Sequence, residues 1–177
     1  AGVYTQNQVV AAPVVLSRSR TPSETIRAVV TNSGNANAAT GESGRSNAET
    51  MCALTAESVG CAADEVLVCS TGWIGYPLPM DAIAPAISVV AGAMNDEGGP
   101  SAARAMMTTD TVPKTTVTTG TTTGGATFTV GGVAKGAAML EPNMATMLGY
   151  VATDAEVDAE LLHRALRLAT DQSFNRI

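Results

Sequence analysis

The sequence is poor in the residues on which many catalytic and structural sites depend. Its 177 residues include one histidine, three cysteines and 3% aromatic residues. A Ser–His–Asp triad could therefore form only around His163, and a histidine-rich zinc site is excluded. The cysteines, Cys52, Cys61 and Cys69, are odd in number and form no CxxC pair, which disfavours a disulfide framework and a structural zinc site. We expect free thiols in a reducing compartment, the cytoplasm.

Basic charge and long apolar runs are also scarce. Against 16 Asp and Glu stand 10 Lys and Arg, so the formal net charge is −6 and the pI is about 4.6. Neither nucleic acid nor an anionic membrane is expected as a partner, because both bind basic surfaces. No run approaches the roughly 20 apolar residues of a transmembrane helix, and the N-terminus does not resemble a signal peptide. Both ends look abrupt, so we expect a piece of a longer polypeptide.

What is present is typical of a globular domain. Hydrophobic residues make up 45% of the chain, enough for a core of small and aliphatic side chains. Periodicity and turn residues predict helices and strands in alternation. The predicted strands cover 9–16, 26–31, 66–69 (running into 70–75) and a hairpin over 115–133. The predicted helices cover 46–60 (ended by Gly60), 81–94 (capped by Asp81), 102–107 and 158–170, with a structured loop over 32–38. We expect an α/β (α+β) layered domain.

Two segments combine polar side chains in patterns that could support chemistry. The segment 135–148 joins Lys135 to small residues, a Pro–Asn turn and Thr146. On the residues alone, Lys135 is predicted to be a solvated lysine in a strand–loop–strand connection, because most loop residues have no chemical role. Thr71 and Gly72 follow an apolar strand, where backbone N–H groups can point at an oxyanion. An ordinary tight turn explains that pattern equally well.

Two further features have simpler explanations. In the segment 106–111, hydroxyls lie beside Asp110 after a helix, which hydrogen bonding at a helix end also explains. His163 lies among leucines of a late helix and is predicted to be a surface residue. The glycines near 131–132 lack the full dinucleotide fingerprint, so no nucleotide site is predicted.

Four blocks in the same order resemble the ornithine acetyltransferase family, whose members are also called bifunctional glutamate N-acetyltransferases. The blocks are TNSGNANAATG (31–41), STGWIG followed by LPM (70–80), AMMTTDTVPK (105–114) and VGGVAKGAAMLEPNMATMLGYVATDA (130–155). The resemblance implies an α/β sandwich shared with self-processing amidopeptidases. It also implies a precursor that cleaves itself before the Thr of the Ala-Thr-Met-Leu motif.

The resemblance also implies roles for particular residues. Cleavage between Ala145 and Thr146 would give an N-terminal threonine, which supplies its own α-amine as base and needs no histidine. Lys135 would bind the α-carboxylate of the substrate, a charge-assisted contact. The implied roles are nucleophile for Thr146, oxyanion pair for Thr71 and Gly72, and substrate contacts for Thr108, Lys135 and Thr146.

The implied function is acetyl transfer from N-acetylornithine to glutamate through a threonine acetyl-enzyme, in the cyclic route of arginine biosynthesis. No cofactor is implied, and acetyl-CoA is left open as a further substrate. Residues 1–145 would form an α-chain-like segment and 146–177 the start of a β-chain-like segment, within one structural domain. Processed α and β chains would assemble into multimers of αβ units. Family members are longer, so further site residues are expected beyond Ile177.

Three residues depart from the family's pattern. Trp73 stands where a small aliphatic residue is usual, close to the implied oxyanion pair, where it would narrow the pocket. Ala138 replaces a usual glycine, and Ala39 replaces a frequent cysteine. Two other functions stay open: a self-processed amide hydrolase or aminopeptidase on the same scaffold, with water as acyl acceptor, and an inactive fragment that lacks the rest of its site.

Overall fold

The computed structural model describes residues 1–136 and 147–176. Within them lie five α-helices, five β-strands and two short 3-10 turns at 63–65 and 174–176. The helices are α1 Ala12–Ser19, α2 Gly41–Val59, α3 Met80–Gly92, α4 Gly99–Ala105 and α5 Ala159–Gln172. The strands are β1 Ala28–Asn35, β2 Val66–Trp73, β3 Lys114–Thr121, β4 Thr127–Lys135 and β5 Leu148–Thr153.

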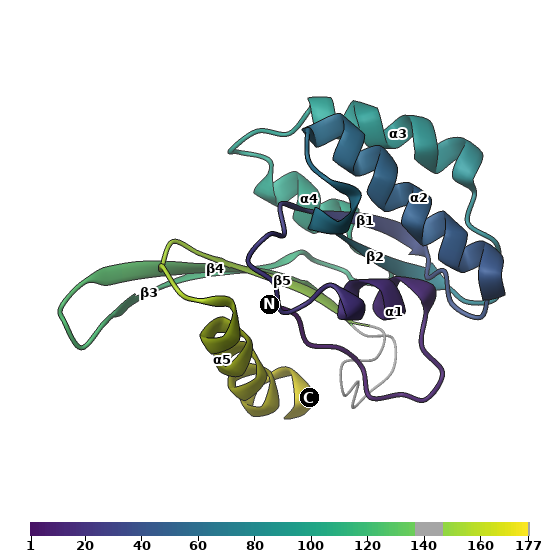
Figure 1. Cartoon of the computed structure of the whole chain (residues 1–177). Coiled ribbons are helices and arrows are strands. Elements are labelled where there is room, and N and C mark those ends of the chain that lie inside the picture. The colour runs from purple at the N-terminus through teal and green to yellow at the C-terminus, as the bar shows by residue number, and fades with distance from the viewer. Residues whose placement is uncertain (137–146, 177) are drawn as a thin grey trace.

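These elements are stacked in layers (Figure 1). Helix α2 covers one face of the parallel pair β1–β2, and α3 packs beside α2. The antiparallel sheet β3–β4–β5 begins beneath the parallel pair and extends to one side, with α5 along its outer face. The order helix, sheet, sheet, helix confirms the predicted α/β sandwich.

Strands β1 and β2 are parallel, as their connection through α2 requires. The register runs from Ala28 opposite Val66 to Gly34 opposite Gly72, and it shifts at Asn35. Since the strands run the same way, their carboxyl ends lie at one edge of the pair. In sheets of this kind, that edge is where ligands usually bind.

The core lies between α2, α3 and the parallel pair. Apart from one methionine, its buried side chains are small or aliphatic, as the scarcity of aromatics requires. The buried cluster consists of Ala48, Met51, Cys52, Ala56, Val66, Val68, Leu78 and Ile87. All three cysteines are free thiols, and Cys52 is fully buried with its thiol donating to the Val66 carbonyl at 3.6 Å.

Helix α1 occupies a region where the sequence predicts a strand over 9–16, so that prediction was wrong. Pro13 gives the reason: in the first turn of a helix it leaves no required N–H unpaired, and its fixed φ fits the helix. The helix lies along the edge of β2 that β1 leaves unpaired. There the Ser17 hydroxyl donates to the Val68 carbonyl at 2.8 Å and accepts from the Val68 N–H at 2.9 Å. Helix α1 therefore covers an edge strand, and an edge covered in this way cannot pair with another chain.

The other helices agree with the prediction apart from their ends. Gly60 ends α2 in the left-handed conformation, with a φ of 74°, but the helix begins at Gly41, five residues early. Asp81 lies in the first turn of α3 and Pro79 takes the N-cap position, so the predicted cap was wrong. The fourth helix covers 99–105 rather than 102–107. None of the helices in the described part of the chain is long and apolar enough to cross a membrane.

The predicted hairpin over 115–133 is confirmed as β3 and β4, which β5 extends to a three-stranded antiparallel sheet. Its side chains are largely exposed or half-buried. Lys135 is the one buried residue of these three strands, every residue of which the structure describes. An ammonium group thus takes the most protected position of the sheet.

A half-buried polar contact joins the two sheets. The Thr31 hydroxyl of β1 and the Tyr150 hydroxyl of β5 lie 2.6 Å apart. Burial raises the pKa of Tyr150, and the nearby Cys69 raises it further. Burial likewise raises the pKa of Cys69, the register partner of Thr31. Both groups therefore stay neutral near pH 7, which suits their position between the two layers.

Candidate functional site

The carboxyl ends of β2 and β4 meet, although 64 residues separate them in sequence. The Lys135 ammonium donates to the Thr71 hydroxyl oxygen at 3.1 Å. Lys135 is 3% exposed and Thr71 is 6% exposed. Because the ammonium can only donate, the Thr71 oxygen accepts, and its own hydrogen is directed elsewhere. The pair offers a buried cation and a hydroxyl donor side by side.

The prediction that Lys135 is a solvated surface lysine was wrong. A lysine is rarely buried without a charge partner or a role. Burial lowers the pKa of Lys135, the charge of Asp110 raises it, and the charge of Lys114 lowers it again. The sequence around Lys135 could not reveal its burial, because Lys135 meets Thr71 of β2, a strand remote in sequence.

Gly72 lies where the backbones of β1 and β2 come close together. A Cβ at this position would lie 2.1 Å from the Gly34 carbonyl carbon, and the φ of Gly72 is 132°. Gly34, its register partner, has a φ of 108°. Only glycine fits there without strain. The predicted Thr71–Gly72 pair therefore lies at a strand end that pairs tightly with β1, instead of in an ordinary turn.

Asp110 links the loop after α4 to the end of β4. Its carboxylate accepts from the Gly136 N–H at 2.5 Å and from the Thr108 N–H at 3.4 Å, and it forms an ion pair with Lys114. Burial would raise the pKa of Asp110, but the hydrogen bonds from Lys114, Gly136 and Thr108 outweigh it and hold the pKa at about 2. Asp110 is therefore ionised at any physiological pH.

Thr108 lies on the same loop, and its side chain is exposed. A second anchor holds this loop against β1, since the Ser33 hydroxyl lies 2.9 Å from the Met107 carbonyl and 3.3 Å from that of Met106. The structure thus brings Thr108 to the region of Lys135 through backbone contacts.

Asparagines shape the turn from β1 into α2. Asn37 is buried with a φ of 48°; its amide donates to the Gly44 carbonyl at 2.8 Å and accepts from the Thr40 hydroxyl at 2.8 Å. Asn35 accepts from the Asn37 N–H at 2.8 Å and donates to the Tyr76 carbonyl at 3.1 Å. The sequence predicted a structured loop over 32–38, but residues 32–35 belong to β1, so the loop is shorter than predicted. Both asparagines hold backbone. The three asparagines at 32, 35 and 37 were the signal for a loop in this part of the sequence.

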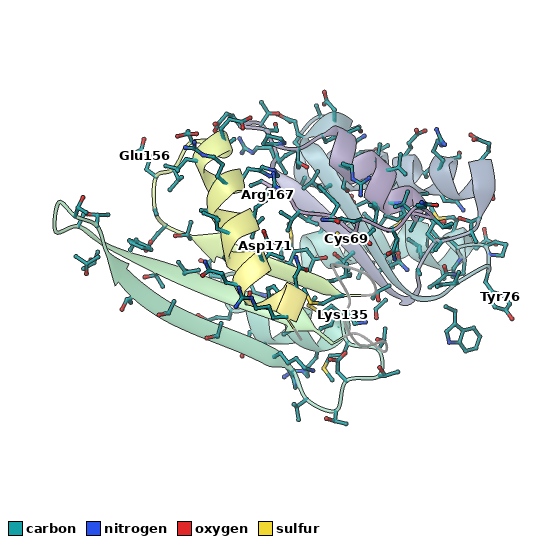
Figure 2. The ribbon with its side chains drawn as sticks, turned by 90° about the horizontal axis from the view of Figure 1, so that it is seen from below. Cys69, Tyr76, Lys135, Glu156, Arg167 and Asp171 are labelled. Atoms are coloured by element: carbon teal, nitrogen blue, oxygen red, sulfur yellow. The ribbon has the colours of Figure 1, made fainter. Side chains whose placement is uncertain are left out.

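Trp73 is the last residue of β2 and lies beside Tyr76. It is 72% exposed, and its ring lies 5.7 Å from that of Tyr76. The two rings line a recess of about 370 Å³ beside residues 32–35. Figure 2 shows Tyr76 apart from Lys135. The expectation that Trp73 narrows the pocket near Thr71 and Gly72 stays a prediction.

His163 is half-buried on α5, and its Nδ1 has no hydrogen-bond partner among the described residues. It lines a second recess, of about 570 Å³, between the N-terminal segment and α5. Figure 2 shows its neighbours on α5, Arg167 and Asp171, apart from Lys135. The prediction that His163 is no catalytic base stays a prediction.

Some predicted residues lie outside the described range: Ala138, Ala145 and Thr146. The sequence places Thr146 two residues before Leu148, which pairs with Lys135 in the register of β4 and β5. Among residues 1–136 and 147–176, no group of three or more His, Cys, Asp or Glu side chains is arranged to hold a metal ion.

The fold and site together define a layered α/β protein with a buried lysine–threonine pair where the parallel and antiparallel strands end. The chain belongs to the ArgJ family, whose model matches residues 1–177. This membership confirms the resemblance to ornithine acetyltransferases that the four blocks carry.

Curated relatives and solved structures agree. The chain is 56% identical to the arginine biosynthesis bifunctional protein ArgJ of Symbiobacterium thermophilum, over 100% of this chain and 44% of that protein. It is 52% identical to the protein of the same name from Geobacter sulfurreducens, over 100% and 45%. The chain therefore spans less than half the length of these relatives.

Two crystal structures share the fold. That of ArgJ from Bacillus halodurans has a TM-score of 0.73 and 44% identity, and the match covers 82% of this chain and 76% of that chain. That of ornithine acetyltransferase complexed with ornithine from Mycobacterium tuberculosis has a TM-score of 0.72 and 40% identity, with 86% and 77% covered.

Proposed function

We propose that the natural full-length protein transfers an acetyl group from N-acetylornithine to glutamate, as a step of arginine biosynthesis. The observation that carries the proposal is the buried Lys135 ammonium on the Thr71 hydroxyl. Both substrates carry an α-carboxylate, which a desolvated ammonium binds strongly. The names of the ArgJ relatives and the ornithine-bound structural neighbour support the same substrate class.

The nucleophile in this proposal is Thr146, exposed as an N-terminal residue by self-cleavage after Ala145. In that cleavage the Thr146 hydroxyl attacks the Ala145 carbonyl, the C–N bond between the two residues breaks, and the hydroxyl proton passes to the released Thr146 amine. Water then hydrolyses the resulting ester to the Ala145 carboxylate and the Thr146 hydroxyl. Residues 1–145 and 146 onward then form the two chains of an αβ unit, and these units assemble into multimers. The free α-amine of Thr146 becomes the base that takes the hydroxyl proton.

Acetyl transfer then takes two displacements. The Thr146 oxygen attacks the acetyl carbonyl of N-acetylornithine, the C–N bond breaks, and ornithine leaves with the proton that the α-amine had taken. The amine of glutamate attacks the acetyl ester, gives a proton to the α-amine, and restores the Thr146 hydroxyl as N-acetylglutamate leaves. No cofactor enters either step, and acetyl-CoA is a further donor to be tested.

Thr71 and Gly72 stabilise the oxyanion of both displacements. The Thr71 hydrogen is directed away from Lys135, which leaves it free to donate to a developing negative charge. One well-placed donor of this kind lowers the barrier by about 3–4 kcal/mol. The free thiols of the chain suit a reducing compartment, so we place the reaction in the cytoplasm.

The test uses the full-length protein with N-acetylornithine and isotope-labelled glutamate. Labelled N-acetylglutamate is the expected product, and mass spectrometry should find two chains that meet at the bond between 145 and 146. Thr146→Ala should stay uncleaved and inactive, whereas Thr118→Ala on the exposed strand β3 should behave as wild type.

Other outcomes decide against the proposal. Release of acetate without N-acetylglutamate would mean an amide hydrolase. Cleavage of Thr146→Ala at the same bond would show that Thr146 is not the nucleophile. A single intact chain with no turnover would mean that self-processing is absent.

A further inference from the structure

The side chain of Asp110 is buried on the loop that follows α4. It is 2% exposed, while Thr108 and Thr109 on the same loop are exposed. Its two oxygens accept from groups on three segments: the Thr108 N–H after α4, the Lys114 ammonium at the start of β3, and the Gly136 N–H after β4. One carboxylate thus joins the loop that bears Thr108 to the strand end that bears Lys135.

Gly136 lets this contact form. A Cβ at position 136 would lie 2.9 Å from Asp110 Oδ1, closer than a methyl group can approach an oxygen without a shift. The backbone of Gly136 is not in the left-handed region, so the glycine is not needed for its φ. What it provides is room for the carboxylate beside the residue that follows Lys135.

We propose that Asp110 is a positioning residue for substrate binding, which fixes the Thr108 loop and the Lys135 strand end at one separation. This inference rests on the proposed function, in which Thr108 and Lys135 both contact the amino-acid substrate. In this role Asp110 acts through Thr108 and Lys135.

A carboxylate is needed for this task. All three groups donate, so their partner must only accept, and an ionised aspartate has two acceptor oxygens and no hydrogen. Asparagine would turn an NH₂ group toward the Gly136 N–H or the Thr108 N–H and lose that contact. The negative charge also acts on Lys135, whose pKa is lowered by burial and by Lys114 and raised by Asp110. Among the described residues, the charged groups that shift the pKa of Lys135 are the acid Asp110 and the base Lys114.

The test compares three variants of the full-length protein. Asp110→Asn should raise the KM for N-acetylornithine and for glutamate at least 10-fold while kcat falls less than 3-fold, because binding geometry is lost and the nucleophile is untouched. Gly136→Ala should raise KM in the same direction, since it displaces the carboxylate without removing its charge. Asp154→Asn is the matched control: Asp154 also accepts a backbone N–H, from Thr129 at 2.7 Å, but on an exposed turn of the sheet.

A second readout needs no turnover. Competitive labelling of lysines with trace acetic anhydride across pH, read by mass spectrometry, gives the pKa of Lys135. Asp110→Asn should lower that pKa, and Asp154→Asn should leave it at the wild-type value. If the wild type transfers no acetyl group, the proposed function fails, but this comparison still decides whether Asp110 acts on Lys135.

Two results would overturn the inference. One is an Asp110→Asn protein with wild-type KM values and a wild-type pKa of Lys135, which would leave Asp110 a structural role alone. The other is a loss of kcat with unchanged KM, which would place Asp110 in the chemical step.

Discussion

The two sheets of this molecule are stabilised in different ways. The parallel pair β1–β2 has α2 on one face and α1 along one edge, and the apolar core of the described residues lies there. The antiparallel sheet β3–β4–β5 has largely exposed side chains, and its one buried residue is a lysine. A strand that buries a charge while leaving its apolar side chains half-open is not arranged for stability alone, because burying a charge costs free energy.

This difference separates scaffold from site. In the parallel layer, apart from Thr71 at the candidate site, the buried side chains of β1, β2 and α2 are apolar or hydrogen-bonded to backbone, as a scaffold requires. In the antiparallel layer, the buried residue is Lys135, at the strand end that faces Thr71. Substitutions in the first layer should therefore change stability, and substitutions at Lys135 should change function.

The largest effect is expected from Gly72→Ala. Its Cβ would meet the backbone of Gly34 at 2.1 Å, and the φ of 132° is strained for alanine, so the strand pair must open. We expect a loss of more than about 4 kcal/mol in the free energy of unfolding, or no soluble protein. Gly131→Ala in β4 is the control: nothing lies within 4 Å of its Cβ, and alanine there should cost nothing or stabilise by up to ~1 kcal/mol. Equal effects in denaturant unfolding would contradict the comparison.

Met51→Ala should have the next largest effect. Met51 is fully buried in the core, and removing its side chain should cost about 2–5 kcal/mol. Val117 on β3 is 73% exposed, and Val117→Ala should change the free energy of unfolding by no more than about 0.5 kcal/mol. Chemical denaturation of both variants compares the two losses in the free energy of unfolding. A loss at Val117 near that at Met51 would mean that β3 is covered in the natural protein.

Local patterns predicted most of the fold. The β-hairpin around Gly124-Gly125, the helix ended by Gly60 and the strand from Val66 depend on residues that are neighbours in sequence. Helix α1 was missed because an apolar run with Pro13 fits a strand and a helix start equally. What decides between them is the edge of β2, some 50 positions further along the chain.

The residues of the candidate site stay a prediction from the resemblance, and the environment of Lys135 was missed by reasoning from the residues alone. The motif resemblance pointed to Thr71, Gly72, Thr108 and Lys135, yet on the residues alone Lys135 had the pattern of a solvated lysine. Lys135 is buried because the two sheets meet there, and the residue pattern within β4 alone cannot predict that meeting. Asp110 was explained as a helix-end residue for the same reason, since its partner Gly136 lies 26 positions away.

Lys135→Met should leave stability nearly unchanged and remove function. Replacing a buried charge with an apolar side chain of similar length spares the cost of desolvation, so the free energy of unfolding should move by less than about 2 kcal/mol. The value of kcat/KM for N-acetylornithine should fall about 100-fold, equivalent to ~2.7 kcal/mol. Steady-state kinetics and unfolding of the same preparation check both. A large loss of stability with intact activity would make Lys135 part of the scaffold.

The smallest effect is expected in the dependence of stability on pH below about 4. In the folded state the pKa of Asp110 is about 2, below its ordinary value of 3.8, so between these values the unfolded chain binds more protons than the folded one. The stabilisation by Asp110 is complete above about pH 4 and is lost as the pH falls toward 2. Asp110→Asn removes this contribution, so its stability should fall less steeply than that of wild type across that window. Denaturant midpoints measured from pH 5 to pH 2 check the slopes. Parallel curves for the two proteins would mean that the three donors around Asp110 do not hold its carboxylate in the folded state, and the link between the Thr108 loop and Lys135 would then be broken.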